Sequence, residues 1–158
     1  MTNNPKILES GVRDVTMGTG VTIVNPSNIY GCSLGNDVFV GPFVEIQQGA
    51  VVGDRTRIQS HAFICDLVTI GTDCFVGHGV MFVNDRFSTG GPARGDQTLW
   101  KETVVGNNVS IGSNATILPV HIGDGIVIGA GSVVTKDLHE PGIYAGNPAR
   151  LLRKLFES

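Results

Sequence analysis

The chain has 158 residues, a length that suits one domain with its own hydrophobic core. Hydrophobic residues make up 41% and charged residues 16% of the sequence, which excludes an intrinsically disordered chain. The formal net charge of -3 provides no general basic surface for nucleic acid. The sequence begins without an apolar signal core and contains no run of about 18 apolar residues, so we expect a cytoplasmic protein that binds neither nucleic acid nor membrane.

The most regular feature of the sequence is a repeat of six residues. Aliphatic or aromatic residues recur at this interval, usually with a small apolar residue two places earlier and often with a glycine one place later. The uninterrupted run is Leu34, Val40, Ile46, Val52, Ile58, Ile64, Ile70, Val76 and Phe82. An amphipathic helix would repeat every 3.6 residues or so, whereas a hexad describes a short strand followed by a tight corner. Three such sides close a triangular coil, so the pattern predicts a parallel β-helix over residues 15–135.

The repeat is interrupted once, between Asn84 and Val105. Residues 84–102 read NDRFSTGGPARGDQTLWKE and are rich in glycine and proline, which predicts a loop that leaves the β-helix. Insertions in repeat proteins commonly gather on the binding face, and the arginines of this segment offer contacts to phosphate. The hexads then resume and bring the expected total to about six coils.

Residues 136–158 follow the last hexads and form the C-terminal part of the single predicted domain. The segment NPARLLRKLFES has a proline near its start and basic residues toward its end, a pattern that predicts a short C-terminal helix. Three cysteines, Cys32, Cys65 and Cys74, lack the spacing of a zinc site or a disulfide framework, so we expect buried reduced thiols.

Residues 18 apart stack in neighbouring coils, which allows the corners to be compared. One corner carries the Asn, Asp, Arg and Thr residues of ordinary turns. The other two corners carry side chains that turns do not require, and these are Phe43, His61 and His78 at one corner and Gln48, Asp66 and Asn84 at the next. Outward-facing aromatic and methionine side chains on the adjoining sides predict contacts with a partner subunit. These are Phe39, Phe63, Phe75 and Met81.

The hexads, the segment SIGSNATILPVHIGDGIVIGAGSVVTKD and the ending AGNPAR resemble the hexapeptide-repeat acyltransferase superfamily. The segments PFVEIQ, IQSHAFICD and GHGVMFVNDRF resemble its branch that N-acetylates amino sugars carried on nucleoside diphosphates. Within that branch the similarity points first to enzymes for dTDP-3-amino-3,6-dideoxyhexoses and next to those for UDP-linked amino-uronic acids. The resemblance implies an all-β, left-handed parallel β-helix and a homotrimer with active sites between subunits. Sugars of this kind usually serve cell-surface polysaccharide synthesis.

The resemblance also assigns roles to residues of this chain, with acetyl-coenzyme A (acetyl-CoA) as donor and no metal. Asn84 would orient the sugar amine, and His78 is our candidate for the group that accepts its proton. The expected substrate-binding residues are His61, Asp66, Asp85, Arg86 and Glu45. The expected acetyl-CoA-binding residues are Ser113, Asn114, Gly129, Ala130, Lys136 and Arg150.

Two other functions remain open at the level of sequence. One is an O-acetyltransferase of a sugar or small alcohol, which would need a firm general base because a hydroxyl is hard to deprotonate. The other is a β-helix scaffold without catalytic activity.

Overall fold

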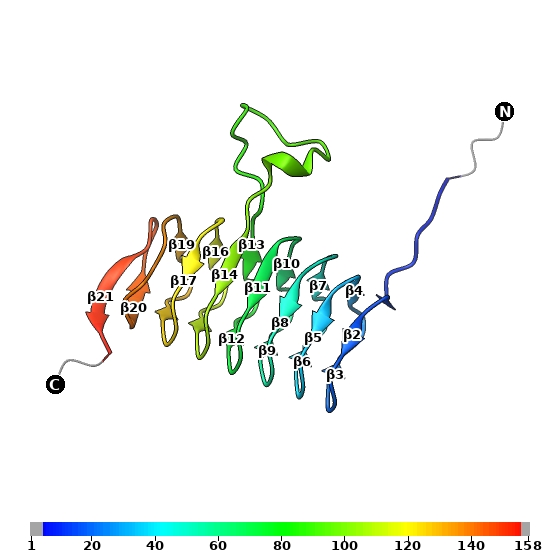
Figure 1. The fold of residues 1–158 in the computed structure, drawn as a ribbon, viewed down its shortest axis with the longest axis horizontal. Helices are drawn as coiled ribbons and strands as arrows, with labels where there is room; N and C mark the ends of the chain where they lie inside the picture. The colour runs from blue at the N-terminus through cyan, green and yellow to red at the C-terminus, as the bar shows by residue number, and fades with distance from the viewer. Residues whose placement is uncertain (1–4, 156–158) are drawn as a thin grey trace.

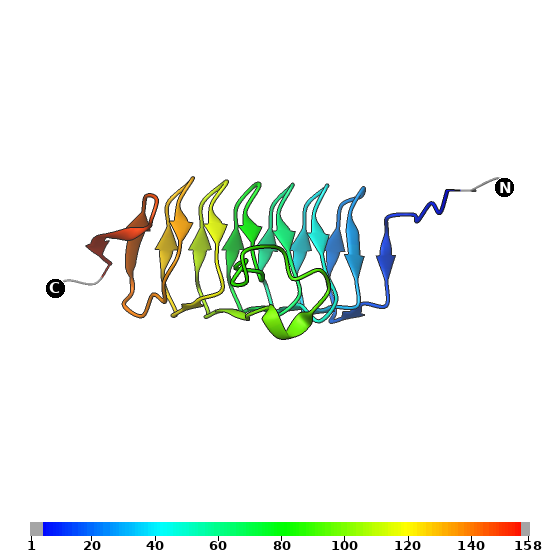
Figure 2. The ribbon, with the colours of Figure 1, turned by 90° about the horizontal axis from the view of Figure 1, so that it is seen from above.

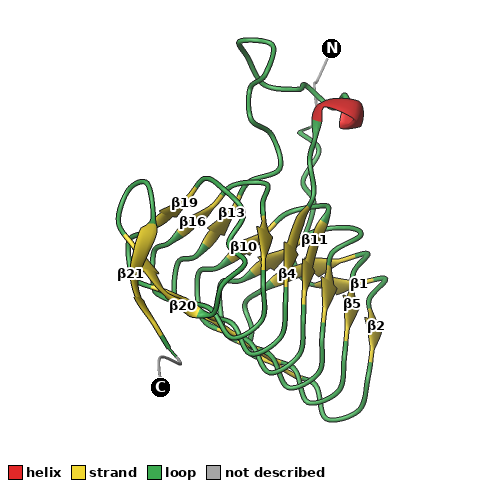
Figure 3. Ribbon diagram, turned by 60° about the vertical axis from the view of Figure 1, so that its left-hand side comes forward, coloured by secondary structure: helices red, strands yellow, loops and turns green. Residues whose placement is uncertain are grey.

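The chain winds into a parallel β-helix, seen in a computed structural model that describes residues 5–155 (Figure 1). Each coil contains three short strands joined at three corners, and Figure 3 shows the resulting three-sided cross-section. Strands of one side stack in parallel with those of the next coil, so the molecule has three sheets. Most strands contain two residues, because the six-residue repeat leaves only that length between corners.

The three sheets, here called A, B and C, have these strands in spatial order. Sheet A contains β1 (Val12–Arg13), β4 (Asn28–Tyr30), β7 (Glu45–Ile46), β10 (Phe63–Ile64), β13 (Met81–Phe82), β16 (Thr116–Ile117) and β19 (Val133–Val134). Sheet B contains β17 (His121–Ile122), β14 (Thr103–Val105), β11 (Val68–Ile70), β8 (Val51–Val52), β5 (Ser33–Leu34) and β2 (Thr16–Met17). Sheet C contains β21 (Arg150–Lys154), β20 (Gly142–Ala145), β18 (Val127–Ile128), β15 (Ser110–Ile111), β12 (Phe75–Val76), β9 (Arg57–Ile58), β6 (Phe39–Val40) and β3 (Thr22–Ile23).

The core consists of columns of aliphatic side chains that point inward from the strands. In sheet A the register pairs Ile29 with Ile46 and Ile46 with Ile64, so identical side chains stack directly above one another. All three are fully buried. Each stacked pair removes apolar surface from water at about 25 cal/mol per Å², which makes these columns the main source of stability. The uninterrupted run of hexad positions from Leu34 to Phe82, predicted to face inward, is confirmed as buried, whereas Met17 at the start of the hexad pattern is 43% exposed.

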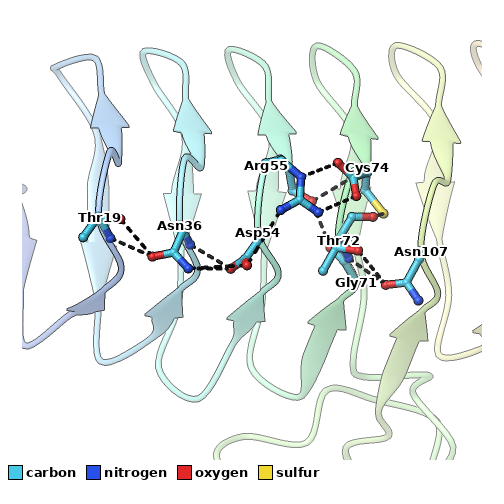
Figure 4. A network of polar contacts seen from close by, with 10 residues as sticks. Thr19, Asn36, Asp54, Arg55, Gly71, Thr72, Cys74 and Asn107 are labelled. Carbon is cyan, nitrogen blue, oxygen red and sulfur yellow. Dashed lines mark hydrogen bonds and ion pairs between the residues drawn. The ribbon is translucent and has the colours of Figure 1, made fainter.

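The corner between sheets B and C is closed by a ladder of polar side chains (Figure 4). The Asn36 main-chain N–H donates to Asp54 Oδ1 at 2.8 Å, and Arg55 donates two hydrogen bonds of 2.7 Å to Asp73. The Arg55 guanidinium lowers the pKa of Asp73 from its ordinary value. These contacts link successive coils, a role that goes beyond the ordinary turns predicted for this corner.

One segment leaves the β-helix, between the end of β13 and the start of β14. It includes a short 3-10 helix, η1 (Gln97–Leu99), whose first turn is capped by the Asp96 side chain. Figures 1 and 3 show the segment standing away from the coils, and Figure 2 shows it above the middle of the molecule. The predicted loop at residues 84–102 is confirmed, and we call it the excursion loop.

The solenoid has about seven coils, where the sequence pattern predicted six. Sheet A has seven strands, and it starts with β1, five residues before the first hexad position at Met17. At the other end β20 pairs in parallel with β18 in a segment that we expected to be a tail. The terminal coils depart from the strict hexad, which is why the repeat did not reveal them.

The predicted C-terminal helix is wrong over the described residues. Arg150–Lys154 forms strand β21, which pairs antiparallel with β20, while residues 156–158 of the expected helix lie outside the described part of the chain. A helix of one or two turns is only marginally stable by itself, whereas β20 offers an open edge with unpaired backbone groups. Pairing with that edge satisfies the backbone of both strands. Within residues 5–155, no helix is long and apolar enough to cross a membrane.

Candidate functional site

The first unusual corner, which we call the histidine corner, lies where the chain enters sheet A. Ser60 Oγ lies 2.8 Å from His78 Nδ1 in the next coil. The rings of Phe43 and His61 stack with their centroids 4.9 Å apart and an angle of 26° between their planes. The predicted stacking of these residues across coils is confirmed.

Phe43 and His61 adopt an uncommon backbone conformation. Their φ angles are 60° and 64°, in the left-handed region where side chains other than glycine and asparagine are strained by roughly 1–2 kcal/mol. The later coils place Gly79, Asn114 and Gly131 at this corner position. The same backbone conformation occurs at Asp37, Arg55, Leu67 and Asp73 of the other corners, so the feature that distinguishes this position is the stacked pair of rings. Phe43 was not among the residues that we predicted to bind substrate, although its place in the corner column was visible in the sequence.

Phe43 also borders a hollow of about 250 Å³ on the outside of sheet A. Glu45 lines the same hollow, and its carboxylate accepts hydrogen bonds from Gln47 Nε2 at 2.9 Å and Asn28 Nδ2 at 3.3 Å. Burial, together with the nearby charges of Glu45 and Asp66, raises the pKa of Tyr30. Glu45 is thus held in place beside an exposed aromatic ring, an arrangement suited to binding a polar planar group.

The second unusual corner, which we call the asparagine corner, lies where the chain leaves sheet A. Asn84 Nδ2 donates to the main-chain oxygen of Asp66 at 3.3 Å, and burial raises the pKa of the Asp66 carboxyl. This bond fixes the Asn84 amide at the root of the excursion loop. Its Oδ1 atom can accept a hydrogen bond from an amine.

Asp85 and Arg86, both predicted to bind substrate, make contacts that shape the excursion loop. Asp85 Oδ1 accepts from the Phe87 N–H at 2.8 Å, and Oδ2 accepts from the Ala93 N–H at 2.7 Å. The Arg86 guanidinium donates to the main-chain oxygen of Pro119 in the next coil. The Asp85 carboxylate and the Arg86 guanidinium therefore make hydrogen bonds within the protein. The spacing of residues in the sequence did not reveal these contacts.

The histidine and asparagine corners lie at opposite ends of the same strands of sheet A. His78 precedes β13 and Asn84 follows it, so six residues separate them and the span is up to roughly 20 Å. The outer face of sheet A lies between the two corners. On this face Met81 is 42% exposed, and Phe63 is half-buried.

The residues predicted to bind acetyl-CoA fall in two places. Ser113 and Asn114 continue the histidine corner, because the Asn114 N–H donates to His78 O and the Gly131 N–H donates to Ser113 O, each at 2.8 Å. Ala130 lies next to Gly131 in the same column. Lys136 instead follows β19 at the far end of the strand, in the column of Asn84, so the structure does not bring it to Ser113.

Gly129 and Arg150, also predicted to bind acetyl-CoA, have structural contacts. A Cβ atom added at Gly129 would lie 2.9 Å from the Ala145 side chain, so this glycine permits the close approach of β20. Arg150 lies in β21 and donates to the main-chain oxygen of Ala149 at 2.9 Å. In residues 5–155 no group of three or more potential protein ligands could hold a metal ion.

The fold defines a class of protein, the parallel β-helices built from hexapeptide repeats, here with a loop that leaves the coils. Two family models match the chain: the bacterial transferase hexapeptide (six repeats) over residues 31–66, and the hexapeptide repeat of succinyl-transferase over residues 102–136. Two separate segments of the chain thus match models of hexapeptide-repeat transferases.

Known proteins with a similar sequence or structure have the same architecture. The bifunctional protein GlmU of Streptococcus uberis is 31% identical over 150 residues, covering 94% of this chain and 30% of GlmU. The chain thus spans about a third of the length of the curated relatives it matches. Two solved structures are also similar. A point mutant of AntD, an N-acyltransferase from Bacillus cereus in complex with dTDP and coenzyme A, has a TM-score of 0.70 and 24% identity, covering 88% of this chain and 83% of AntD. The hexapeptide-repeat acetyltransferase VCA0836 from Vibrio cholerae, in complex with acetyl-CoA, has a TM-score of 0.66 and 28% identity, covering 80% of this chain and 72% of VCA0836.

Proposed function

We propose that this protein is an acetyl-CoA-dependent N-acetyltransferase that acts on the amino group of a nucleoside-diphosphate-linked amino sugar. The preferred acceptor class is a dTDP-3-amino-3,6-dideoxyhexose, made in the cytoplasm for cell-surface polysaccharide. AntD, similar in fold, is an N-acyltransferase that binds dTDP and coenzyme A, which supports the choice of nucleotide and donor. VCA0836 is described as an acetyltransferase and binds acetyl-CoA.

The observation that carries this proposal is the placement of Asn84. Its amide is anchored on Asp66 O at the point where the excursion loop begins, with Oδ1 available to accept from a substrate amine. An amide can orient a neutral amine but cannot remove a proton from a hydroxyl, so this corner suits N-acylation.

The reaction joins the sugar nitrogen to the thioester carbon and releases coenzyme A as its thiol. The amine, held by Asn84, attacks the carbonyl carbon, and a tetrahedral intermediate forms with negative charge on oxygen. A backbone N–H of the upper coils stabilises that oxygen. The C–S bond then breaks, and the proton lost by nitrogen ends on the sulfur of the leaving thiolate.

His78 is placed to relay this proton. In the tautomer with hydrogen on Nδ1, that atom donates to Ser60 Oγ and leaves a lone pair on Nε2. A sugar amine becomes strongly acidic once it has attacked the thioester, so a weak base or water is enough. His78 therefore contributes less than an obligatory general base would.

The corners that carry His78 and Asn84 are too far apart in one chain to act on one atom, so we propose a homotrimer with each site between two subunits. Phe75 and Met81, both 42% exposed, lie on the sides that adjoin these corners and provide apolar surface for that contact. The histidine corner of one subunit then faces the asparagine corner of its neighbour.

An O-acetyltransferase is the second candidate, favoured by the hydrogen bond between Ser60 and His78, which orients a potential general base. A thiol-release assay with dTDP- and UDP-linked amino sugars, and with their hydroxyl analogues, separates the two activities. We expect release with a dTDP-linked amine and an N-acetyl product by mass spectrometry. Release only with hydroxyl acceptors would overturn the proposal, and no acetyl-CoA binding by calorimetry would indicate a scaffold.

A further inference from the structure

A second hollow, of about 420 Å³, lies directly beside Asn84 on the outside of sheet A. Its floor consists of residues that immediately follow β13, β16 and β19, three strands that lie side by side below the root of the excursion loop (Figure 3). Its side is formed by the first residues of that loop. The lining residues are Val83, Asp85, Arg86, Phe87, Leu118 and Thr135.

The charged groups in this lining already make hydrogen bonds within the protein. Both carboxylate oxygens of Asp85 accept main-chain hydrogen bonds, and the Arg86 guanidinium is bound to Pro119 O. What remains for a ligand is mainly the carbon surface of Val83, Leu118 and Phe87, with the Phe87 side chain 59% exposed. A sugar or phosphate placed there would lose much of its hydration and gain few hydrogen bonds, chiefly from the Thr135 hydroxyl, whereas an apolar group would gain by leaving water.

The position of the hollow indicates which apolar group it receives. If Asn84 holds the amine, the thioester carbon must approach within about 3–3.5 Å of the amine nitrogen during the reaction. The carbon chain of the donor begins at that same atom. Val83 and Asp85, the chain neighbours of Asn84, both line the hollow, so a chain that extends from the thioester carbon can enter it.

The size of the hollow exceeds what an acetyl group needs. The methyl of an acetyl group is comparable to one water molecule, which occupies about 30 Å³ in the liquid. A hollow of about 420 Å³ holds a chain of several carbons even when much of its volume is open to solvent. The hollow therefore has more apolar space than acetyl transfer requires.

We infer that this hollow is an acyl pocket, through which the protein uses acyl-CoA donors with linear or branched chains of about four or five carbons as well as acetyl-CoA. The inference rests on the proposed function and specifies its donor. Each methylene that enters the pocket should raise kcat/KM about threefold, up to the length that the pocket holds.

The test compares kcat/KM for acetyl-, propionyl-, butyryl- and isovaleryl-CoA with a dTDP-linked amino sugar, in the wild type and in Val83→Phe. We expect the wild type to favour butyryl- or isovaleryl-CoA over acetyl-CoA by about tenfold. Val83→Phe, which fills the pocket, should abolish this preference, so that the ratio of kcat/KM for butyryl-CoA to kcat/KM for acetyl-CoA falls by about tenfold. Val51→Phe places the same enlargement on exposed sheet B, away from the pocket, and should keep the wild-type preference.

Several outcomes separate this inference from the proposed function. A wild-type kcat/KM that falls steadily from acetyl- to butyryl-CoA overturns the acyl pocket and leaves amino-sugar acetylation intact. An equal loss with every donor in Val83→Phe also overturns it. If no donor supports turnover, the proposed function fails and calorimetry decides the inference: butyryl-CoA binding no tighter than acetyl-CoA would overturn it.

Discussion

The main-chain oxygen of Asn84 accepts a hydrogen bond of 2.9 Å from the N–H of Lys101, so the excursion loop leaves and rejoins the β-helix at one point. The coils on either side remain in register, since Phe82 pairs with Ile117 and Ile70 pairs with Val105. A long stretch of chain thus separates two residues that are hydrogen-bonded neighbours.

Excision of the loop should therefore leave the fold intact. Replacing residues 86–100 by two glycines should change the Tm by less than about 5 °C, because it removes few core contacts and shortens a closed loop. Turnover should fall to less than about 1% of wild type, since the excision removes Arg86 and Phe87, which line the hollow beside the proposed amine-binding residue Asn84. Circular dichroism and thiol release measure the two effects, and full activity in the excised protein would show that the loop serves assembly or stability instead.

Asn84→Ala should lower kcat/KM by roughly tenfold to a thousandfold, which corresponds to about 1.4–4 kcal/mol of lost positioning. Affinity for acetyl-CoA should change little, because Ser113 and Asn114, which we expect to bind it, lie at the histidine corner of later coils. Gln48→Ala is the matched control, since Gln48 is an amide in the same corner column two coils away. Turnover of Asn84→Ala close to that of wild type, in an intact oligomer, would remove the proposed role.

His78→Ala should reduce kcat by less than about a hundredfold, below the range of an obligatory general base. The reason is that Asn84 orients the amine and water can take the proton. A pH–rate profile in the wild type and in His78→Asn provides the measurement. A loss of about four orders of magnitude would instead identify His78 as the general base and favour the O-acetyltransferase.

The three cysteines should resist thiol reagents in the folded protein. Cys32, Cys65 and Cys74 are free and buried, and burial raises the pKa of Cys65 to about 12 and that of Cys32 to about 11. The reactive thiolate is therefore scarce at neutral pH, and access is blocked as well. Ellman's reagent under mildly alkaline conditions should label none of them in native protein and all of them in guanidinium chloride. Rapid labelling of Cys65 without denaturant would mean that the asparagine corner opens.

Ionisation of Asp66 should lower the free energy of unfolding, whereas ionisation of Asp73 should raise it. Burial raises the pKa of Asp66, so its ionisation destabilises the fold at neutral pH and the penalty disappears as the pH falls through that raised pKa. Arg55 lowers the pKa of Asp73, so its contribution is present above the ordinary value of about 3.9 and is lost below it.

Asp66→Asn should accordingly raise the Tm at about pH 7, and the gain should shrink toward about pH 4. Asp73→Asn should lower the Tm slightly at about pH 7, because the pair with Arg55 is exposed, and the loss should shrink toward about pH 3. Differential scanning calorimetry at the three pH values decides both. A shift of the same sign for the two variants at neutral pH would contradict the environments described for these carboxyls.

The sequence predicted the β-helix, the excursion loop and the stacking of corners because one inward residue per hexad carries most of the folding energy. A column such as Ile29, Ile46 and Ile64 appears in the sequence as a periodic pattern. That pattern can be recognised without knowing which strands pair. The C-terminal strand Arg150–Lys154 shows no such periodic pattern. It is stabilised by pairing with the edge of β20, which exists only after β20 has formed.

The candidate site was predicted less completely, for reasons that are also physical. Stacking at intervals of 18 placed Ser60 against His78 and Asn84 against Asp66. The hydrogen bonds of Asp85 and Arg86 depend on how the excursion loop turns back on itself, which spacing does not encode. Phe43 was not assigned to the substrate site, because spacing shows neither its 57% exposure nor the strained backbone that holds its ring outward.

The antiparallel strand β21 has a consequence for how long an object this chain can form. A stack of identical coils has no intrinsic end, because its last coil offers three parallel edges on which another chain could continue the same pattern. β21 covers one of those edges with a strand of reversed direction, and its residues, three of them basic, are all exposed. A second molecule arriving there meets a strand of the wrong direction and exposed basic side chains. The β20–β21 hairpin therefore hinders the end-to-end stacking of β-helices that would build a fibre.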